Sequence, residues 1–381
     1  MTSPANALPR ISVAAPRLDG KEREYVLECM DTTWISSVGR FISEFEKGFA
    51  EYCGVRNAIA CNNGTTALHL ALVALDIGPG DEVIVPSLTY IASANAVTYC
   101  GATPVLIDND PGTFNLDPAK LEALITPKTK AIMPVHLYGQ ICDMDPILEI
   151  AKKHGLYVVE DAAEAVGATY KGKKSGALGT CATFSFFGNK IITTGEGGMV
   201  LVQDDGLAAR ARSLRNLCFI KAKRFRHEEL GYNFRLTNVQ AAMGVGQVGR
   251  IESIVARKRE IAAKYDELLG NLAGVSLPKE ASWARNVYWV YGLLLDETLP
   301  VDAEGLSARL ARDGIETRPY FIGMHEQPVF QEMGLFHGEK YPVTENLARR
   351  GLYIPSGMTL TDEQIVTVAN SVRKHIHDGI Q

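Results

Sequence analysis

The chain has 381 residues, of which 46% are hydrophobic and 22% are charged, and its formal net charge is −5. This composition is typical of a globular protein with two or three domain-sized units. The slight excess of acidic residues argues against nucleic acid or an anionic membrane as the main partner. The seven cysteines form no CxxC pair and no metal-ligand spacing, so we expect reduced thiols, a cytoplasmic location and no metal site. The N-terminal residues lack a signal-peptide pattern, and no apolar run is long enough to cross a bilayer.

From about residue 55 the chain alternates short apolar segments with helical patterns. The apolar segments, in chain order, are NAIAC, DEVIVP, TPVLID, KAIMPV, LYVVED, ATFSFF and GMVLV. Continuous apolar strands that alternate with helices are typical of parallel strands buried on both faces. The sequence therefore predicts an α/β fold with a mainly parallel sheet in a large domain.

After Gln240 the pattern changes to one long amphipathic stretch, for which we predict a single helix over residues 241–272 that bridges two domains. The apolar segment VYWVYGLLL, a helix at 302–313 and a helical C-terminus predict a smaller α+β domain. The predicted domains are residues 1–250 and 251–381. We expect the first thirty or so residues to pack back onto one of these units, with the small domain as a candidate.

Several residues that could carry chemistry follow the predicted strands. In an open parallel sheet, ligands bind beyond the carboxyl ends of the strands. The residues at these positions are Gly64 and Thr65, Tyr90, Asp161 with Ala163, and Ser185 with Lys190. Taken singly, each has an ordinary structural explanation, such as a helix cap, a core aromatic or a surface lysine.

Together these residues fit one cofactor, pyridoxal 5′-phosphate. A desolvated lysine with a depressed pKa can form a Schiff base with an aldehyde, and a buried carboxylate can keep a pyridine nitrogen protonated. A helix N-terminus with glycine and threonine is a ready phosphate site. An aromatic ring can stack on one face of the cofactor while a small residue allows close approach on the other. The glycine-rich TTGEGG after Lys190 lets the backbone fold close around the lysine.

Over nearly its whole length the chain resembles the DegT/DnrJ/EryC1/StrS sugar aminotransferases, which have the aspartate-aminotransferase fold. The matching segments, in the family's order and spacing, are GTTALHLAL, GDEVIVPSLTYIASANAV, GATPVLID, PVHLYG, VEDAAEAVGA, ATFSFFGNKIITTGEGGMV and LGYNFRLTNVQAA. The resemblance implies that Lys190 is the Schiff-base lysine and that Asp161 is the partner of the pyridine nitrogen. It also implies that Tyr90 stacks on the cofactor ring and that Ala163 is the small residue on the other face.

The resemblance also implies the remaining contacts with the cofactor. Thr65 and Ser185 match phosphate ligands, and Glu164 matches a position near the ring oxygen. Asn238, in LTNVQ, matches a residue that reaches the phosphate of a neighbouring subunit, which implies a homodimer at least. A dehydratase branch of the fold carries histidine in place of the lysine, so Lys190 favours transamination.

Within the family, RISVAAPRLDG, the FFGNKIITTGEGG form of the lysine motif and MHEQPVF are most similar to one branch of members. That branch moves the amino group of L-glutamate to C4 of GDP-4-keto-6-deoxy-D-mannose in two half-reactions, for O-antigen or related lipopolysaccharide synthesis. The basic segment KAKRFRH contains Lys221 and Arg224, and it is either a clamp for the sugar-nucleotide diphosphate or a solvated loop. His325, in GMHEQP, either lines the substrate site or is structural.

Two alternatives stay open at the level of the sequence. One is an aminotransferase for another nucleotide keto sugar, linked to UDP or dTDP and aminated at C3 or C4. The other is a sensor that binds the cofactor or a sugar without catalysis, although the complete set of Lys190, Asp161, Tyr90 and Ser185 argues against it. A Rossmann dehydrogenase is disfavoured because no G-x-G-x-x-G stands between a strand and a helix.

Overall fold

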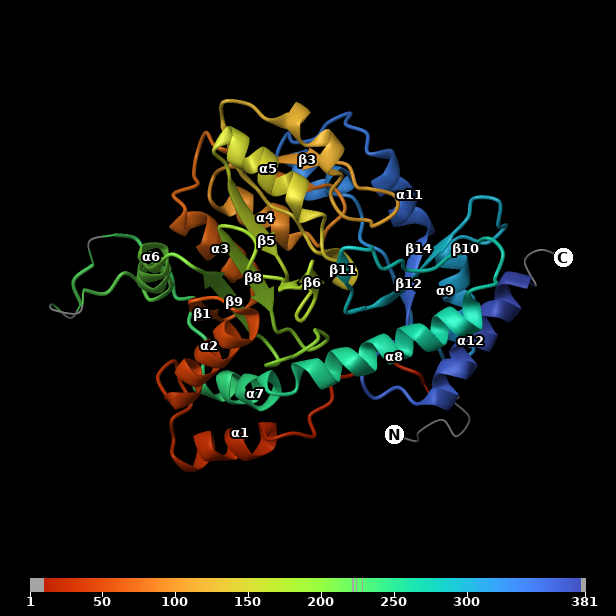
Figure 1. The fold of residues 1–381 in the computed structure, drawn as a ribbon, viewed down its shortest axis with the longest axis horizontal. Helices are drawn as coiled ribbons and strands as arrows, with labels where there is room; N and C mark the ends of the chain where they lie inside the picture. The colour runs from red at the N-terminus through yellow and green to blue at the C-terminus, as the bar shows by residue number, and fades with distance from the viewer. Residues whose placement is uncertain (1–9, 221–222, 224, 228, 378–381) are drawn as a thin grey trace.

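The computed structural model describes residues 10–220, 223, 225–227 and 229–377, and its centre is a seven-stranded sheet of order β1-β9-β8-β5-β4-β2-β3 (Figure 1). The strands are β1 Asn57–Cys61, β2 Glu82–Pro86, β3 Thr103–Ile107, β4 Thr129–Ile132, β5 Tyr157–Asp161, β8 Cys181–Ser185 and β9 Gly198–Val202. All neighbours are parallel except β9, which runs antiparallel to both β1 and β8. The predicted α/β class with a mainly parallel sheet is confirmed.

Helices cover both faces of this sheet (Figure 1). On one face lie α2 (Arg40–Cys53) and α5 (Met144–His154), and on the other lie α3 (Gly64–Ala74), α4 (Ala92–Tyr99) and α6 (Asp205–Arg215). Successive residues of β1 point to opposite faces, so Ala60 joins the first layer and Ile59 the second. In the first layer the ring of Phe49 meets that of Phe184 edge-on, with centroids 4.9 Å apart. This burial on both sides explains the continuous apolar strands of the sequence.

The prediction of one helix over 241–272 is wrong, because the structure has two helices there. They are α7 (Asn238–Val248) and α8 (Ile251–Leu269), which are separated at Gly249, a weak helix former. Helix α7 packs closely on α1 (Glu22–Asp31) and α2. A Cβ added to Gly244 would lie 2.7 Å from the ring of Phe45, so the glycine permits this close approach.

A second, four-stranded antiparallel sheet of order β10-β12-β14-β13 lies near the C-terminus (Figure 1). Its elements, with the helices that share its core, are β10 Val275–Ser276, β12 Tyr291–Leu295, β13 Arg318–Pro319, β14 Gly351–Ile354, α8, α9 Ala303–Arg312 and α12 Asp362–His377. Ile11 bridges to Ile315 beside this sheet, whereas α1 packs on α7. The N-terminal residues thus contact both units. The division into domains at residues 250–251 stays a prediction.

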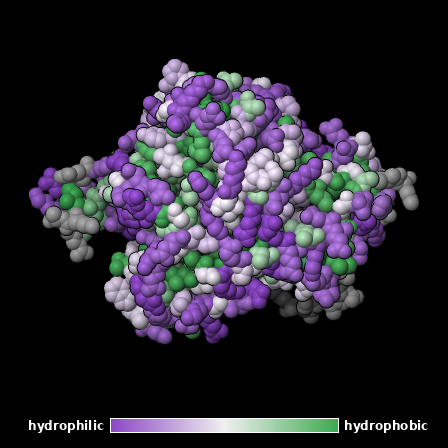
Figure 2. Space-filling model, in the orientation of Figure 1, coloured by the Kyte–Doolittle hydropathy of each residue, from purple (hydrophilic) through white to green (hydrophobic). Residues whose placement is uncertain are grey.

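The remaining elements are short helices and a small three-stranded sheet. They are η1 Pro118–Lys120, η2 Glu122–Leu124, η3 Leu137–Gly139, η4 Met324–Glu326, α10 Pro328–Glu332, α11 Pro342–Arg350 and the small sheet of β11 Ala284–Arg285, β6 Thr169–Tyr170 and β7 Lys173–Lys174. The face in Figure 2 is mainly hydrophilic with small apolar patches, one of them where α2 and α7 lie in Figure 1. Across the described part of the chain, no helix is both long and apolar enough to span a membrane.

Candidate active site

The carboxyl ends of β5 and β8, which are neighbours in the sheet, bring the first group of predicted residues together. Ser185 ends β8, and the N-terminus of α3 packs against it so closely that a Cβ on Gly64 would lie 2.8 Å from the Cβ of Ser185. The first N–H groups of a helix lack partners within the helix. Asn63 caps α3 by accepting from the N–H of Thr66 at 2.9 Å, which leaves the turn at Gly64 and Thr65 suited to an anion.

Asp161, at the end of β5, is a buried carboxylate without a salt-bridge partner in the described chain. Its Oδ2 accepts from Ser93 Oγ at 2.8 Å, and its Oδ1 accepts from the N–H of Ala163 at 3.2 Å. Ser93 Oγ is in turn 2.9 Å from Thr89 Oγ1. Burial raises the pKa of Asp161 despite these hydrogen bonds. A cation placed beside this carboxylate would restore its charge, as a protonated pyridine does.

Lys190 lies in the turn that follows β8, next to two groups that affect its charge. Its Nζ is 3.7 Å from Glu164 Oε1 and 3.7 Å from the ring centroid of Trp289. Burial lowers the pKa of Lys190, although Glu164 and Asp161 act in the opposite direction. For Glu164, burial raises the pKa to about 7, and its Oε2 accepts from the N–H of Tyr138 at 2.7 Å. The lysine can therefore lose its proton more easily than a lysine in water, which suits a nucleophile or a base.

Trp289 is a site residue that the sequence analysis did not identify. It comes from the segment just before β12, is 5% exposed, and donates from Nε1 to the carbonyl of Asn189 at 2.8 Å. The indole is thus fixed by the residue that precedes Lys190 in the chain, and its face holds the lysine. Ser93 was also missed. The contact of Trp289 with Lys190 and that of Ser93 with Asp161 have no local signature in the sequence.

The ring of Tyr90 is exposed enough to stack on a ligand. The residue is 58% exposed in the loop between β2 and α4, and its ring centroid is 5.8 Å from that of Phe321. It directly follows Thr89, which belongs to the hydrogen-bonded group around Asp161. Ala163, two residues after Asp161, is half-buried. The exposed ring of Tyr90, which is linked to Asp161 through Thr89 and Ser93, is suited to stacking on a planar ligand.

The structure does not bring Asn238 into this group. Its side chain is 2% exposed, accepts from the N–H of Phe41 at 3.1 Å, and donates to the carbonyl of Trp34 at 2.6 Å. The amide nitrogen also contacts Cys29 Sγ at 3.3 Å. These contacts hold the side chain within its own subunit. A contact of Asn238 with the phosphate of a neighbouring subunit stays a prediction.

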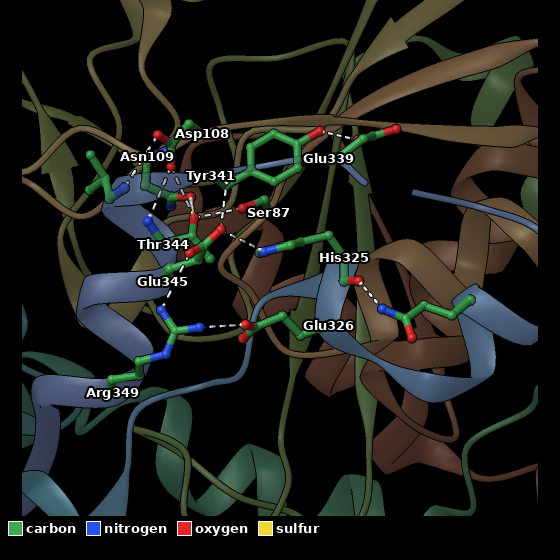
Figure 3. A network of polar contacts seen from close by, with 12 residues as sticks. Ser87, Asp108, Asn109, His325, Glu326, Glu339, Tyr341, Thr344, Glu345 and Arg349 are labelled. Carbon is green, nitrogen blue, oxygen red and sulfur yellow. Dashed lines mark hydrogen bonds and ion pairs between the residues drawn. The ribbon is translucent and has the colours of Figure 1, made fainter. Parts of the chain in front are cut away.

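His325 is placed in a buried polar network, shown in Figure 3, that joins α11 to the ends of β2 and β3. It is 5% exposed, its Nε2 lies 3.4 Å from Glu345 Oε1, and its ring packs on Tyr341. In the same network Asp108 accepts from the N–H of Thr344 at 3.1 Å, at the start of α11. This burial leaves His325 little surface for a substrate, which favours the structural explanation. Lys221 and Arg224 lie outside the described residues.

No group of three or more histidine, cysteine or acidic side chains with the geometry of a metal site occurs in the described part of the chain. The site is therefore built from a lysine, buried carboxylates, hydroxyls, a helix N-terminus and aromatic rings. Such a set can hold an anion at one end and a protonated heterocycle at the other, with an amine between them.

Comparison with known proteins gives the class of the chain. The model of the DegT/DnrJ/EryC1/StrS aminotransferase family matches residues 16–373, and the chain belongs to this family of aminotransferases. It is 61% identical to the GDP-perosamine synthase of Caulobacter vibrioides, over 94% of this chain and 96% of that protein. It is 46% identical to the GDP-perosamine synthase of Escherichia coli O157:H7, over 97% of this chain and 99% of that protein. Among solved structures, DesV of S. venezuelae in complex with a ketimine intermediate has a TM-score of 0.88 and 37% identity, and covers 97% of this chain and 99% of its own.

Proposed function

We propose that this chain is a pyridoxal 5′-phosphate-dependent aminotransferase that forms GDP-perosamine. It would transfer the amino group of L-glutamate to C4 of GDP-4-keto-6-deoxy-D-mannose. The observation that carries the proposal is the largely buried side chain of Lys190, which lies against Glu164 and Trp289 at the sheet end that also holds Asp161. Two GDP-perosamine synthases that are similar over nearly the whole chain support the choice of sugar nucleotide.

The residues at the ends of β5 and β8 fit the cofactor. Asp161 would face the pyridine nitrogen, because it is a buried carboxylate that forms no salt bridge with any described residue. Gly64, Thr65 and Ser185 would hold the phosphate, and the exposed side chain of Tyr90 would cover the ring. When bound, the cofactor supplies an electron sink that makes the proton next to the transferred nitrogen acidic.

Lys190 and Glu164 would then control the transfer of this proton. Lys190 Nζ, whose pKa is lowered by burial, would take the proton from Cα of the amino donor and later deliver a proton to C4 of the sugar. Glu164, which is within 3.7 Å of this nitrogen, would stabilise the lysine whenever it carries the extra proton. Two half-reactions through one site predict ping-pong kinetics.

We also propose a homodimer and a cytoplasmic location, with a role in O-antigen or lipopolysaccharide synthesis. Five large apolar residues are exposed on α1 and in the loop that joins it to α2, and a second copy of the chain would cover them: Leu27, Met30, Trp34, Ile35 and Val38. The seven free cysteines support a reducing compartment.

The test is a reaction of the purified protein with pyridoxal 5′-phosphate, L-glutamate and a panel of keto sugars linked to GDP, UDP and dTDP. The expected result is an amino sugar from the GDP substrate alone, with equimolar 2-oxoglutarate, both identified by mass spectrometry. Amination of a UDP or dTDP substrate instead would favour the alternative substrate class. No amination of any substrate would favour the sensor.

A further inference from the structure

Lys258 is a buried lysine that the proposed mechanism does not use. It lies on α8, is 5% exposed, and its Nζ donates to Ser356 O at 2.5 Å and contacts Ser356 Oγ at 3.2 Å. No acidic side chain in the described residues pairs with it. Burial alone lowers the pKa of Lys258 to about 7. Buried charges in proteins are normally paired, so the charged form of Lys258 would be stabilised by an anion that binds next to it.

The cavity that Lys258 lines also reaches Lys190 and Trp289. Its other walls come from α7, from the N-terminal segment at Ala14 to Arg17, and from the loop after β14. Among the described residues, no aspartate or glutamate lines this cavity, which sets it apart from the Asp161 side of Lys190. An acid-free cavity with several cationic residues attracts an anion.

The three cations of the cavity differ in what they are free to do. Lys190 is the amine of the proposed chemistry, and Arg17 is paired with Asp19 in the N-terminal segment. Of the described residues that line the cavity, Lys258 alone is a buried cation without a carboxylate partner. It is also fixed on a long helix and held by Ser356, so a ligand would find it preorganised.

We propose that this cavity is the subsite for a carboxylate of the amino donor, and that Lys258 is the cation that binds it. The inference rests on the proposed function, because an α-amino dicarboxylate must present its amino-bearing carbon to Lys190 while its carboxylates find partners nearby. The keto sugar has no carboxylate. Lys258 therefore acts in the amino-acid half-reaction and not in the sugar half-reaction.

The test compares Lys258→Met and Lys258→Gln with Ser356→Ala, which keeps the charge and removes one hydroxyl. Calorimetry on the cofactor-loaded protein measures the Kd of glutarate, a dicarboxylate that cannot react. Loss of a hydrogen bond to a charged group predicts about a tenfold or larger rise in Kd for both lysine variants. Ser356→Ala should change the Kd less than threefold.

Rapid kinetics then separate the two half-reactions. The KM of L-glutamate should rise in the lysine variants, while the rate of amine transfer between the pyridoxamine form and the keto sugar stays as in the wild type. Glutarate that binds Lys258→Gln as tightly as the wild type, in a protein with the same melting temperature, would overturn the inference. A wild type that binds glutarate but does not react with L-glutamate would contradict the proposed function and leave the subsite supported.

Discussion

Trp289→Leu should lower the pKa of Lys190, because the indole stabilises only the charged form of the lysine. The Nζ of Lys190 lies 3.7 Å from the ring centroid of Trp289, and both side chains are largely buried. A desolvated cation–π contact contributes about 2 kcal/mol. Since 1.36 kcal/mol corresponds to one pKa unit, removing the ring should lower the pKa by about 1.5 units. Burial already lowers the pKa of this lysine, so the two effects act in the same direction.

The assay is competitive labelling of the cofactor-free protein with acetic anhydride between pH 6 and pH 11. Mass spectrometry of the peptide that contains Lys190 gives the midpoint of its reactivity at each pH. Trp283→Leu is the matched control, because Trp283 lies next to the small sheet, where its carbonyl accepts from the N–H of Lys171. A midpoint for Trp289→Leu that equals the wild type or rises above it would refute the role of the indole.

Three further predictions concern single side chains. Asp161→Asn should slow the half-reaction with L-glutamate by roughly 10²-fold in stopped-flow absorbance. It would remove the carboxylate that pairs with the protonated pyridine nitrogen of the bound cofactor, and losing one partner of a buried ion pair costs about 3 kcal/mol or more. Asn238→Ala should lower the free energy of unfolding by about 1–3 kcal/mol in urea titrations, because it leaves a buried N–H without its acceptor; an unchanged stability with weaker cofactor binding would instead favour the predicted role as phosphate ligand. Burial acts to raise the pKa of Glu252, but hydrogen bonds from Lys174 and Tyr52 lower it to about 2. Its contribution to stability is therefore present above the unfolded pKa of about 4.3 and lost as the pH falls toward 2, so Glu252→Gln should cost about 1 kcal/mol at pH 7 after allowance for its exposure and nothing near pH 2.

The position of the candidate site at the carboxyl ends of the parallel strands could be predicted from the sequence by a simple rule. Buried strands read as apolar runs, and the polar residues that follow parallel strands meet at one edge. This rule brings Asp161 and Ser185 together, and Gly64 follows from the need for a close approach to Ser185. Lys190 follows because it comes within one turn of the same strand.

The contacts that were missed join residues far apart in the chain. Trp289 is about a hundred residues from Lys190, and its segment was interpreted only as a strand of the smaller domain. The contact of Asn238 with Phe41 was also missed: Thr237 and Gln240 form a capping box that places Asn238 in the first turn of α7, facing the N-terminal segment. The break at Gly249 was missed because the apolar pattern continues on both sides of it.

The most direct test of the account is the visible absorption spectrum of the protein with pyridoxal 5′-phosphate, before and after L-glutamate, for the wild type and Lys190→Ala. The account predicts a Schiff-base band in the wild type that L-glutamate converts to the pyridoxamine form, and no such band in Lys190→Ala. A Schiff-base band that L-glutamate leaves unchanged would contradict L-glutamate as the amino donor. Identical spectra for the two proteins would contradict the central claim that Lys190 is the reactive amine.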